Sequence, residues 1–174
     1  SPTDDSTIKV ADFGFAKRVE RPNSLTTRCG SPAYTAPEII NYQPYDQRAD
    51  NWSLGVILFT ILGGYPPFYE NTVHETFQQI RQCNYQFHPS FWDGISRDAK
   101  HLIKALLTLN PEWRCTAQEA LQHPWMTGRG TADDELKQSK PLKMNLEQFK
   151  KYNAERKRET KVSNVSMYWL LTRR

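Results

Sequence analysis

The sequence has 174 residues, a formal net charge of +4 and 38% hydrophobic residues, which is enough for one packed domain and a tail. Its longest apolar run, 54–62, contains a glycine and a threonine and is too short to span a bilayer, so no membrane partner is expected. The beginning, SPTDDST, lacks the basic start and apolar stretch of a signal peptide. The three cysteines form no CxxC pair, which is typical of reduced thiols in an intracellular protein, cytoplasmic or nuclear.

The positive charge is concentrated at the C-terminal end. Residues 129–174 carry twelve Lys/Arg and six Asp/Glu, a balance of +6, whereas residues 1–128 carry eleven and thirteen, a balance of −2. The larger part of the chain therefore gives no reason to expect nucleic acid as a partner. The question of a charged partner concerns the tail alone.

The first two predicted elements are a strand and a long apolar helix. Thr7–Ala11 is β-rich and is predicted to form a short strand. Residues 48–62 (RADNWSLGVILFTIL) are apolar almost all round after the first turn, which predicts a helix buried on every side. Gly63 and Gly64 are predicted to end this helix.

Capping residues and apolar spacing predict the remaining helices of the body. Thr72 and Glu75 form a capping box for a helix that continues through Gln82. Its apolar positions, predicted to be buried, are Val73, Phe77 and Ile80. Ser96 is predicted to begin a helix that Asn110-Pro111 ends, and a second capping box predicts a short helix from residue 116. The apolar stripe of the helix after Ser96 consists of Ala99, Leu102, Ile103, Leu106 and Leu107.

The chain is organised around the stretch from Asp12 to Glu38. It opens with DFG directly after the predicted strand and closes with APE before the apolar helix. Between them lie hydroxyl residues interspersed with arginines. DFG and APE in this order, at the separation of a loop, are typical of the activation segment of a protein kinase.

On these motifs the chain resembles the C-terminal lobe of a Ser/Thr protein kinase, and the resemblance covers residues 7–126. It includes DNWSLG, NPEWR and HPW as well as DFG and APE. DFGFAK, NSLTTRCGSPAYTAPEII and GYPPFY resemble the calcium/calmodulin-dependent group, including its MAP-kinase-activated relatives. The resemblance implies a mainly α fold, the kinase C-lobe part of the α+β kinase fold. The expected organisation is a partial kinase domain over 1–126, a linker over 127–145 and a basic tail over 146–174.

The resemblance also implies ATP and Mg²⁺ as cofactors and assigns the DFG residues to catalysis. Asp12 is expected to be an oxygen ligand of the metal ion. Phe13 is expected to pack under the site, and Gly14 to adopt an unusual backbone angle. Read as residues alone, Asp12 could instead be a simple turn residue.

Three residues are expected to hold the segment on the body. The resemblance implies a buried ion pair between Glu38 and Arg114, which would tie the activation segment to the helical base. Asp50 resembles the residue that holds the catalytic-loop backbone. An acid at a helix start is also favoured by the helix dipole, so the two interpretations of Asp50 are compatible.

Thr27 occupies the usual activating phosphosite of the family, with Thr26 as its competitor. A phosphate there could pair with nearby arginines and order the loop, and its addition would require an upstream activating kinase. The alternative is an exposed loop hydroxyl without regulatory role. The residues expected to bind the protein substrate are Ser31, Pro32 and Tyr34.

Three kinase motifs are absent from the sequence: the Gly-rich loop, the V-A-I-K lysine and the H-R-D-L-x-x-x-N catalytic loop. We therefore expect a fragment of a longer product that transfers no phosphate by itself. The whole product is expected to be a Ser/Thr kinase. The alternative is a truncated or pseudokinase lobe that binds partners without catalysis.

The tail stretch LEQFKKYNAERKRE resembles the regulatory segment that follows calmodulin-dependent kinase domains. Calmodulin captures such segments as amphipathic helices. The apolar residues expected to contact calmodulin are Leu146, Phe149, Tyr152, Val162, Val165 and Trp169. Glu155 and Glu159 interrupt the basic face, and the alternative is a solvated charged tail.

Overall fold

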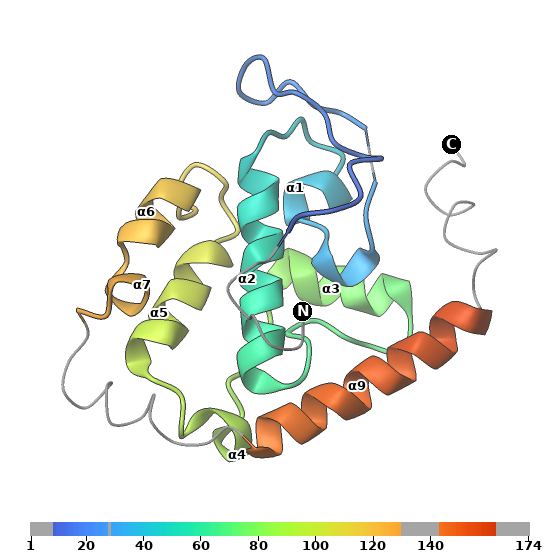
Figure 1. Cartoon of the computed structure of the whole chain (residues 1–174). Helices are drawn as coiled ribbons and strands as arrows, with labels where there is room; N and C mark the ends of the chain where they lie inside the picture. The colour runs from blue at the N-terminus through green and yellow to red at the C-terminus, as the bar shows by residue number, and fades with distance from the viewer. Residues whose placement is uncertain (1–8, 28, 130–142, 163–174) are drawn as a thin grey trace.

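The computed structural model describes residues 9–27, 29–129 and 143–162, which are mainly helical (Figure 1). In chain order the helices are η1 (Pro32–Tyr34), α1 (Pro37–Ile40), α2 (Arg48–Gly63), α3 (Val73–Gln82), α4 (Pro89–Trp92), α5 (Arg97–Leu106), α6 (Ala117–Gln122), α7 (Pro124–Thr127) and α9 (Lys143–Val162). Within these ranges no β-strand forms, and one isolated antiparallel bridge joins Leu25 to Tyr45. The expected mainly α architecture is confirmed.

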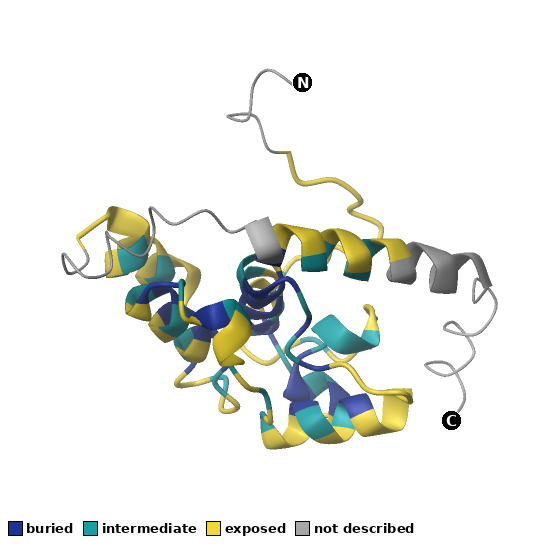
Figure 2. Ribbon diagram, turned by 90° about the horizontal axis from the view of Figure 1, so that it is seen from below, coloured by how far each residue is buried: buried dark blue, intermediate teal, exposed yellow. Residues whose placement is uncertain are grey.

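Helix α2 is the centre of the body, and α4, α5, η1 and α9 pack around it. Its inner side chains Trp52, Val56 and Phe59 are fully buried. The rings that surround Phe59, at centroid distances of 4.7–5.7 Å, are those of Tyr65, Tyr85, Phe87 and Trp92. The helix ends where glycine was predicted to end it: Gly64 has φ 80° and its N–H donates to the carbonyl of Thr60. Figure 2 shows the buried residues gathered around this helix.

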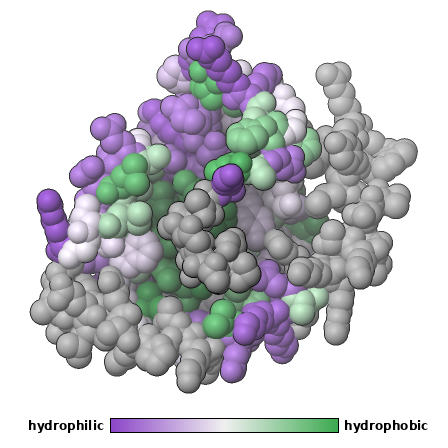
Figure 3. Space-filling view, in the orientation of Figure 1, coloured by the Kyte–Doolittle hydropathy of each residue, from purple (hydrophilic) through white to green (hydrophobic). Residues whose placement is uncertain are grey.

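The prediction that α2 is buried on every side is wrong. Leu54, Ile57 and Ile61 are 49%, 42% and 54% exposed, and their spacing of three and four residues places them on one face. The described helices pack against other faces of α2 and leave this apolar stripe about half exposed. In Figure 3 apolar surface gathers over the middle of the molecule, below a largely hydrophilic upper end.

Helices α3 and α5 follow the predicted capping but differ from the prediction in burial and length; of the apolar positions of α3, Ile80 is buried as predicted and Phe77 is only half-buried. The Thr72–Glu75 capping box forms, but Val73 is 41% exposed because it is the first residue of α3, after an exposed stretch over 69–72. The side chain of Ser96 accepts a hydrogen bond from the N–H of Ala99, and the whole predicted apolar stripe of α5 is buried. The helix ends at Leu106, earlier than the predicted stop at residue 110.

Three short α-helices that were not predicted begin with proline, as does the 3₁₀ turn η1. These are α1, α4 and α7, and in each the proline stands at one of the first two helical positions, where its missing N–H costs no hydrogen bond. They connect the longer helices and position the aromatic loops of the core. Sequence periodicity cannot detect such helices because each has only one turn.

The prediction of a strand over residues 7–11 is not supported in its described part. Residues 9–11 have no strand structure, and nearly all residues from 9 to 20 are exposed. A strand needs a neighbour for its backbone hydrogen bonds, and the described residues provide none beside this segment.

None of the described helices has the length and apolar content that crossing a bilayer requires.

Helix α9 lies against the body instead of extending into solvent (Figures 1 and 2). It begins at Lys143, inside the stretch predicted as linker. Its first turn contacts the C-terminal end of α2, and Tyr152 meets the ring of Tyr69 edge-on at a centroid distance of 6.3 Å. Among its described side chains, those of residues 145–154, half are exposed and the others are buried or half-buried.

Candidate active-site lobe

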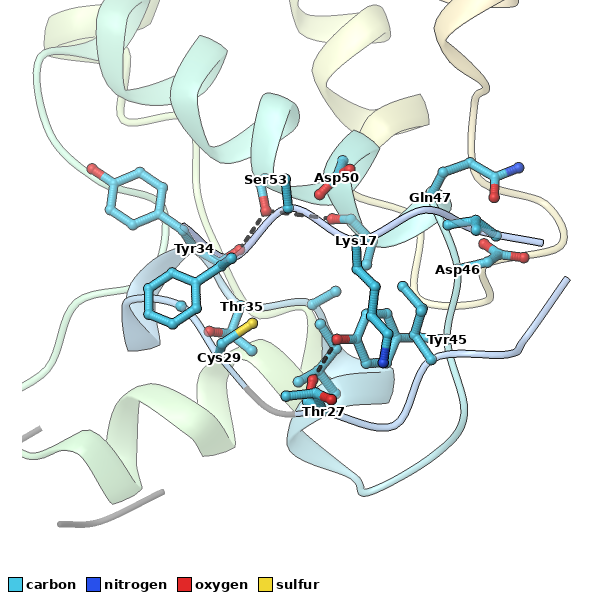
Figure 4. A pocket seen from close by; sticks show the side chains of 18 of the residues that line it. Lys17, Thr27, Cys29, Tyr34, Thr35, Tyr45, Asp46, Gln47, Asp50 and Ser53 are labelled. Atoms are coloured by element: carbon cyan, nitrogen blue, oxygen red, sulfur yellow. Dashed lines mark hydrogen bonds between the residues drawn. The ribbon is translucent and has the colours of Figure 1, made fainter. Parts of the chain in front are cut away.

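The activation segment and the beginning of α2 border a cavity of about 730 Å³ (Figure 4). Asp12, Thr27 and Ser31 of the segment reach this cavity, and so do Asp50 and Ser53 of α2. The residues to which the resemblance assigned metal binding, phosphorylation, substrate contact and loop support therefore border one space. Which role each residue has stays a prediction.

The DFG turn has a conformation different from the expected one. The unusual backbone angle is at Asp12, with φ 65°, whereas Gly14 has no left-handed φ. Phe13 is 69% exposed, so the prediction that it packs under the site is wrong in this structure. The N–H of Gly14 donates to Oδ1 of Asp12 at 3.4 Å, and this local bond favours the turn.

Thr27 is exposed, but its backbone is held by Tyr45. The hydroxyl of Tyr45 donates to the carbonyl oxygen of Thr27, and the backbones of Tyr45 and Leu25 exchange hydrogen bonds at 2.9 and 3.0 Å. Thr26 is also exposed. Lys17, to which the sequence reasoning gave no role, points into the same cavity in Figure 4. Arg28 lies outside the described residues.

The substrate-binding candidates are arranged by η1. Pro32 and Tyr34 belong to this single turn, and Ser31 precedes it. Ser53 of α2 donates its hydroxyl proton to the carbonyl of Tyr34 at 2.8 Å, which fixes the turn on the body. A smaller cavity of about 50 Å³ opens beside η1, and its apolar wall includes side chains from α1 and α3. The residues that line it are Cys29, Gly30, Pro32, Thr35, Ile39, Ile40, Tyr42 and Phe77.

Glu38 and Arg114 form the ion pair that the resemblance implied. Two parallel hydrogen bonds of 2.7 and 2.9 Å join the guanidinium to the two carboxylate oxygens, and both side chains are buried. The guanidinium also donates to the carbonyls of Arg48, Thr108 and Leu109. It lies over the ring of Trp52 at 5.2 Å. The pair thus joins the end of the activation segment to α2 and to the loop after α5.

Two acids at the start of α2 have different surroundings. Asp50 stands at the rim of the large cavity, where nearby protein atoms remove water and raise the pKa of its carboxyl. Asp46 is buried, and its carboxylate accepts hydrogen bonds from the N–H groups of Arg48 and Asn23 at 2.9 and 3.4 Å. The sequence reasoning missed Asp46, although an acid two residues before a helix is a recognisable capping signal. It missed Tyr45 and Ser53 as well, whose contacts no local pattern indicates.

The apolar residues of the tail do not share one exposed face. Leu146 is 52% exposed, whereas Phe149 and Tyr152 are half-buried against the body. Val162 is the last residue of α9, and its side chain lies outside the described part of the chain. Val165 and Trp169 also lie outside it.

Comparison with known proteins adds independent information. The family described as "Protein kinase domain" matches residues 2–126. The chain is 45% identical to calcium/calmodulin-dependent protein kinase type 1B of Rattus norvegicus over 136 residues, which are 78% of this chain and 39% of that protein. The Homo sapiens protein of the same name is 44% identical with the same coverage. A probable myosin light chain kinase of Dictyostelium discoideum is 42% identical over 158 residues, 91% of this chain and 39% of that protein. The chain thus spans about two fifths of the length of these relatives.

Proposed function

Because this chain belongs to the protein kinase family, we propose that its protein transfers the γ-phosphoryl group of ATP to serine and threonine hydroxyls of other proteins. One observation carries the proposal: Asp12, Thr27 and Ser31 border the same cavity on a rigid helical base. A lobe that only bound partners would have no need of a carboxylate in that position. The chain itself supplies the activation segment and the body, and the nucleotide-binding motifs are absent from its sequence.

Protein kinases generally use ATP and Mg²⁺, and Asp12 fits the role of a metal ligand. Magnesium in such sites is bound by one or two carboxylates together with nucleotide phosphates, so a single exposed carboxylate at a cavity is sufficient from this lobe. Among the described residues no group of three or more His, Cys, Asp or Glu side chains could hold a metal ion. The bound ion would neutralise charge on the phosphoryl group during transfer.

We further propose Thr27 as the activating phosphosite. Its side chain is exposed to an upstream kinase while Tyr45 holds its backbone, and Lys17 borders the same cavity. A phosphate on Thr27 would pair with the Lys17 ammonium through a charge-assisted hydrogen bond. This pairing would join two parts of the activation segment, the one around Lys17 and the one around Thr27.

The small cavity beside η1 suits an apolar side chain of the protein substrate. Its wall contains Ile39, Ile40 and Phe77, and the hydroxyl of Thr35 donates to the carbonyl of Ser31 at 3.0 Å. Because this internal hydrogen bond already uses the hydroxyl proton of Thr35, a bound side chain does not have to supply an acceptor for it. We propose that this cavity receives the residue that follows the phosphoacceptor.

For the tail, we propose that calcium-loaded calmodulin binds α9. Support comes from its basic charge and from the apolar residues Phe149 and Tyr152. Both rings face the body, so capture by calmodulin requires α9 to leave its place. The acidic residues 155 and 159 should weaken the attraction.

Kinase activity is tested by expressing the complete coding sequence and comparing Asp12→Asn with Asp93→Asn. Both changes are isosteric, and Asp93 is an exposed residue after α4, away from the cavity. We expect Asp12→Asn to lower transfer of labelled phosphate to a Ser/Thr peptide library by at least about a hundredfold. Asp93→Asn should match the unmodified protein. Full activity of Asp12→Asn would contradict the proposal, and partner binding without any transfer would favour a non-catalytic lobe.

The phosphosite is tested by comparing Thr27→Ala with Thr26→Ala, since both threonines are exposed neighbours. Mass spectrometry of the active protein should find phosphate on Thr27, and Thr27→Ala should lower activity while Thr26→Ala does not. Phosphate on Thr26 alone, with activity lost in Thr26→Ala, would exchange the two assignments.

A further inference from the structure

Asn145 is the one buried residue among the described side chains of α9, the others being half-buried or exposed. Its relative exposure is 5%, whereas the flanking Leu146 and Glu147 are exposed. The side-chain nitrogen Nδ2 donates to the carbonyl oxygen of Leu62 at 2.5 Å and to that of Phe91 at 2.9 Å. These acceptors lie 83 and 54 residues earlier in the sequence. One amide therefore joins the tail to the ends of two separate helices of the body.

The two carbonyls need such a donor. Leu62 lies in the last turn of α2, where carbonyls have no partner within the helix, and Phe91 lies in the single turn of α4. A carboxamide NH₂ has two hydrogens, so one asparagine can satisfy both acceptors at once. Burying the Asn145 amide without these bonds would cost free energy, and the contact therefore tolerates little displacement.

The body is shaped to receive the first turn of α9. A Cβ atom at Gly64 would lie 2.5 Å from the backbone oxygen of Asn145 and 3.0 Å from Cβ of Gln148. The glycine that ends α2 thus also permits the close approach of α9. Further along, no described side chain of α9 is fully buried: Phe149 and Tyr152 are half-buried, Tyr152 meets Tyr69 edge-on, and Lys150 and Lys151 are exposed.

We propose that Asn145 is the positioning residue that fixes α9 on the body, and that α9 detaches from its far end first and from Asn145 last. The anchoring contact, defined as the two hydrogen bonds of Asn145, rests on geometry alone. Its regulatory consequence rests on the proposed binding of calmodulin. A partner that captures α9 must separate the Asn145 amide from Leu62 and Phe91, so this contact sets the apparent affinity of the tail for the partner.

The anchoring contact is tested by hydrogen exchange of the full chain, with Asn145→Asp compared with Glu147→Gln. Both substitutions are isosteric, and only the first removes the two donors. A detached α9 is marginally stable in water, so backbone amides of residues 146–154 should exchange about tenfold faster or more in Asn145→Asp. Glu147→Gln and the amides of α5 should show no change. Unchanged exchange of residues 146–154 in Asn145→Asp would overturn the proposal.

A second variant covers the case in which Asn145→Asp unfolds the body, seen as lost protection in α5. Tyr152→Ala removes the far contact and leaves Asn145 in place. Exchange should then accelerate for residues 149–154 and stay slow for the amides of residues 146–148, which supports the order of detachment. Equal acceleration along the whole helix would overturn it.

Calmodulin binding separates the anchoring contact from the proposed function. In the full chain, Asn145→Ala should tighten calcium-dependent calmodulin binding by about tenfold, because less energy is needed to free α9. Peptides of residues 143–170 with Asn or Ala at position 145 should bind equally, because neither is docked. If both peptides bind calmodulin and the two full chains also bind it with equal affinity, the role of Asn145 is overturned. Failure of both peptides to bind would contradict the calmodulin proposal instead, and the exchange result would still decide the anchoring contact.

Discussion

The helical body and the activation segment differ in what determines their conformation. In the body, Trp52, Phe59 and Trp92 are fully buried, and their rings pack against other buried or half-buried aromatic residues. In the segment, Phe13 and Phe15 are 69% and 64% exposed. The body is therefore held by its own packing. Before η1, the segment is held by a few hydrogen bonds from the region around the start of α2.

This difference indicates that the activation segment can change conformation at a smaller cost in free energy than the body. The bonds of Tyr45 to Thr27, of Asp46 to Asn23 and of Ser53 to Tyr34 hold the segment at separate points. Each typically contributes about 0.5–1.5 kcal/mol, so a phosphate or a partner can rearrange the segment between these points without opening the core. The Glu38–Arg114 pair lies at the boundary between the activation segment, held by hydrogen bonds, and the body, held by packing.

The largest contrast is expected between Phe59→Ala and Phe13→Ala. Truncating the buried ring should lower the free energy of unfolding by about 3–5 kcal/mol, because a cavity is left among four aromatic neighbours. Truncating the exposed ring should change it by less than about 0.5 kcal/mol. Urea denaturation of the purified chain measures both. A cost above 1 kcal/mol for Phe13→Ala would place that ring in a packed site and remove the contrast.

The boundary itself is tested by Glu38→Gln against Glu112→Gln. Both glutamates pair with an arginine, but Glu38 is buried with Arg114, whereas Glu112 is exposed where it contacts Arg48. Leaving Arg114 as a buried charge without its anion should cost roughly 3 kcal/mol, and the exposed pair less than about 1 kcal/mol. Equal denaturation midpoints of the two variants would show that burial of the pair does not matter.

Packing at the end of α2 gives a smaller effect through Gly63→Ala. A Cβ there would lie 2.7–2.9 Å from the Trp92 indole, which cannot move easily, so the substitution should destabilise the body by about 1–3 kcal/mol. Gly94→Ala is the matched control, since a Cβ at Gly94 meets no atom within 4 Å. Thermal unfolding should show a lower midpoint for Gly63→Ala only. A stabilising Gly63→Ala would mean that Trp92 has an alternative position.

The smallest effect is expected from pH at the junction of α6 and α7. Nδ1 of His123 accepts the N–H of Trp125 at 3.2 Å, so the His123 proton is on Nε2, which lies 2.8 Å from Nδ1 of His101. Partial burial and the neighbouring His101 lower the pKa of His123 from its ordinary value of 6.5. The folded chain then binds fewer protons than the unfolded one. The stability contribution is complete above pH 6.5 and is lost as the pH falls through the lowered pKa.

His123→Asn tests this, because asparagine keeps a capping acceptor and does not titrate. Acidification from about pH 7.5 to 5.5 should reduce the thermal midpoint of the unmodified chain slightly more than that of His123→Asn. The same pH dependence in both proteins would assign the acid sensitivity to other groups.

Helices with both a cap and a periodic stripe could be predicted from the sequence. The capping boxes of α3 and α6 and the stripe of α5 depend on residues within one helix, so local sequence contains the required information. The exposure of Val73 depends instead on where the neighbouring elements end. The same holds for Leu54, Ile57 and Ile61: an all-apolar helix indicates burial but not which of its sides has a neighbour.

For the candidate site, the sequence proposed residues but did not indicate their geometry. The pairing of Glu38 with Arg114, 76 residues apart, was implied by the family resemblance and is present in the structure. The angle at Asp12 and the exposure of Phe13 follow from contacts that the motif does not describe. Asn145 had no local signal at all, because its two acceptors belong to α2 and α4.

The exposed stripe of α2 leads us to expect self-association of this chain in solution. Leu54, Ile57 and Ile61 form a contiguous apolar strip, and such strips promote contacts between molecules in proportion to concentration. Light scattering of the purified chain should therefore rise with protein concentration, and Ile57→Lys should suppress that rise while leaving the buried face of the helix intact. Unfolding measurements on this chain belong in dilute solution, where self-association does not add to the apparent stability.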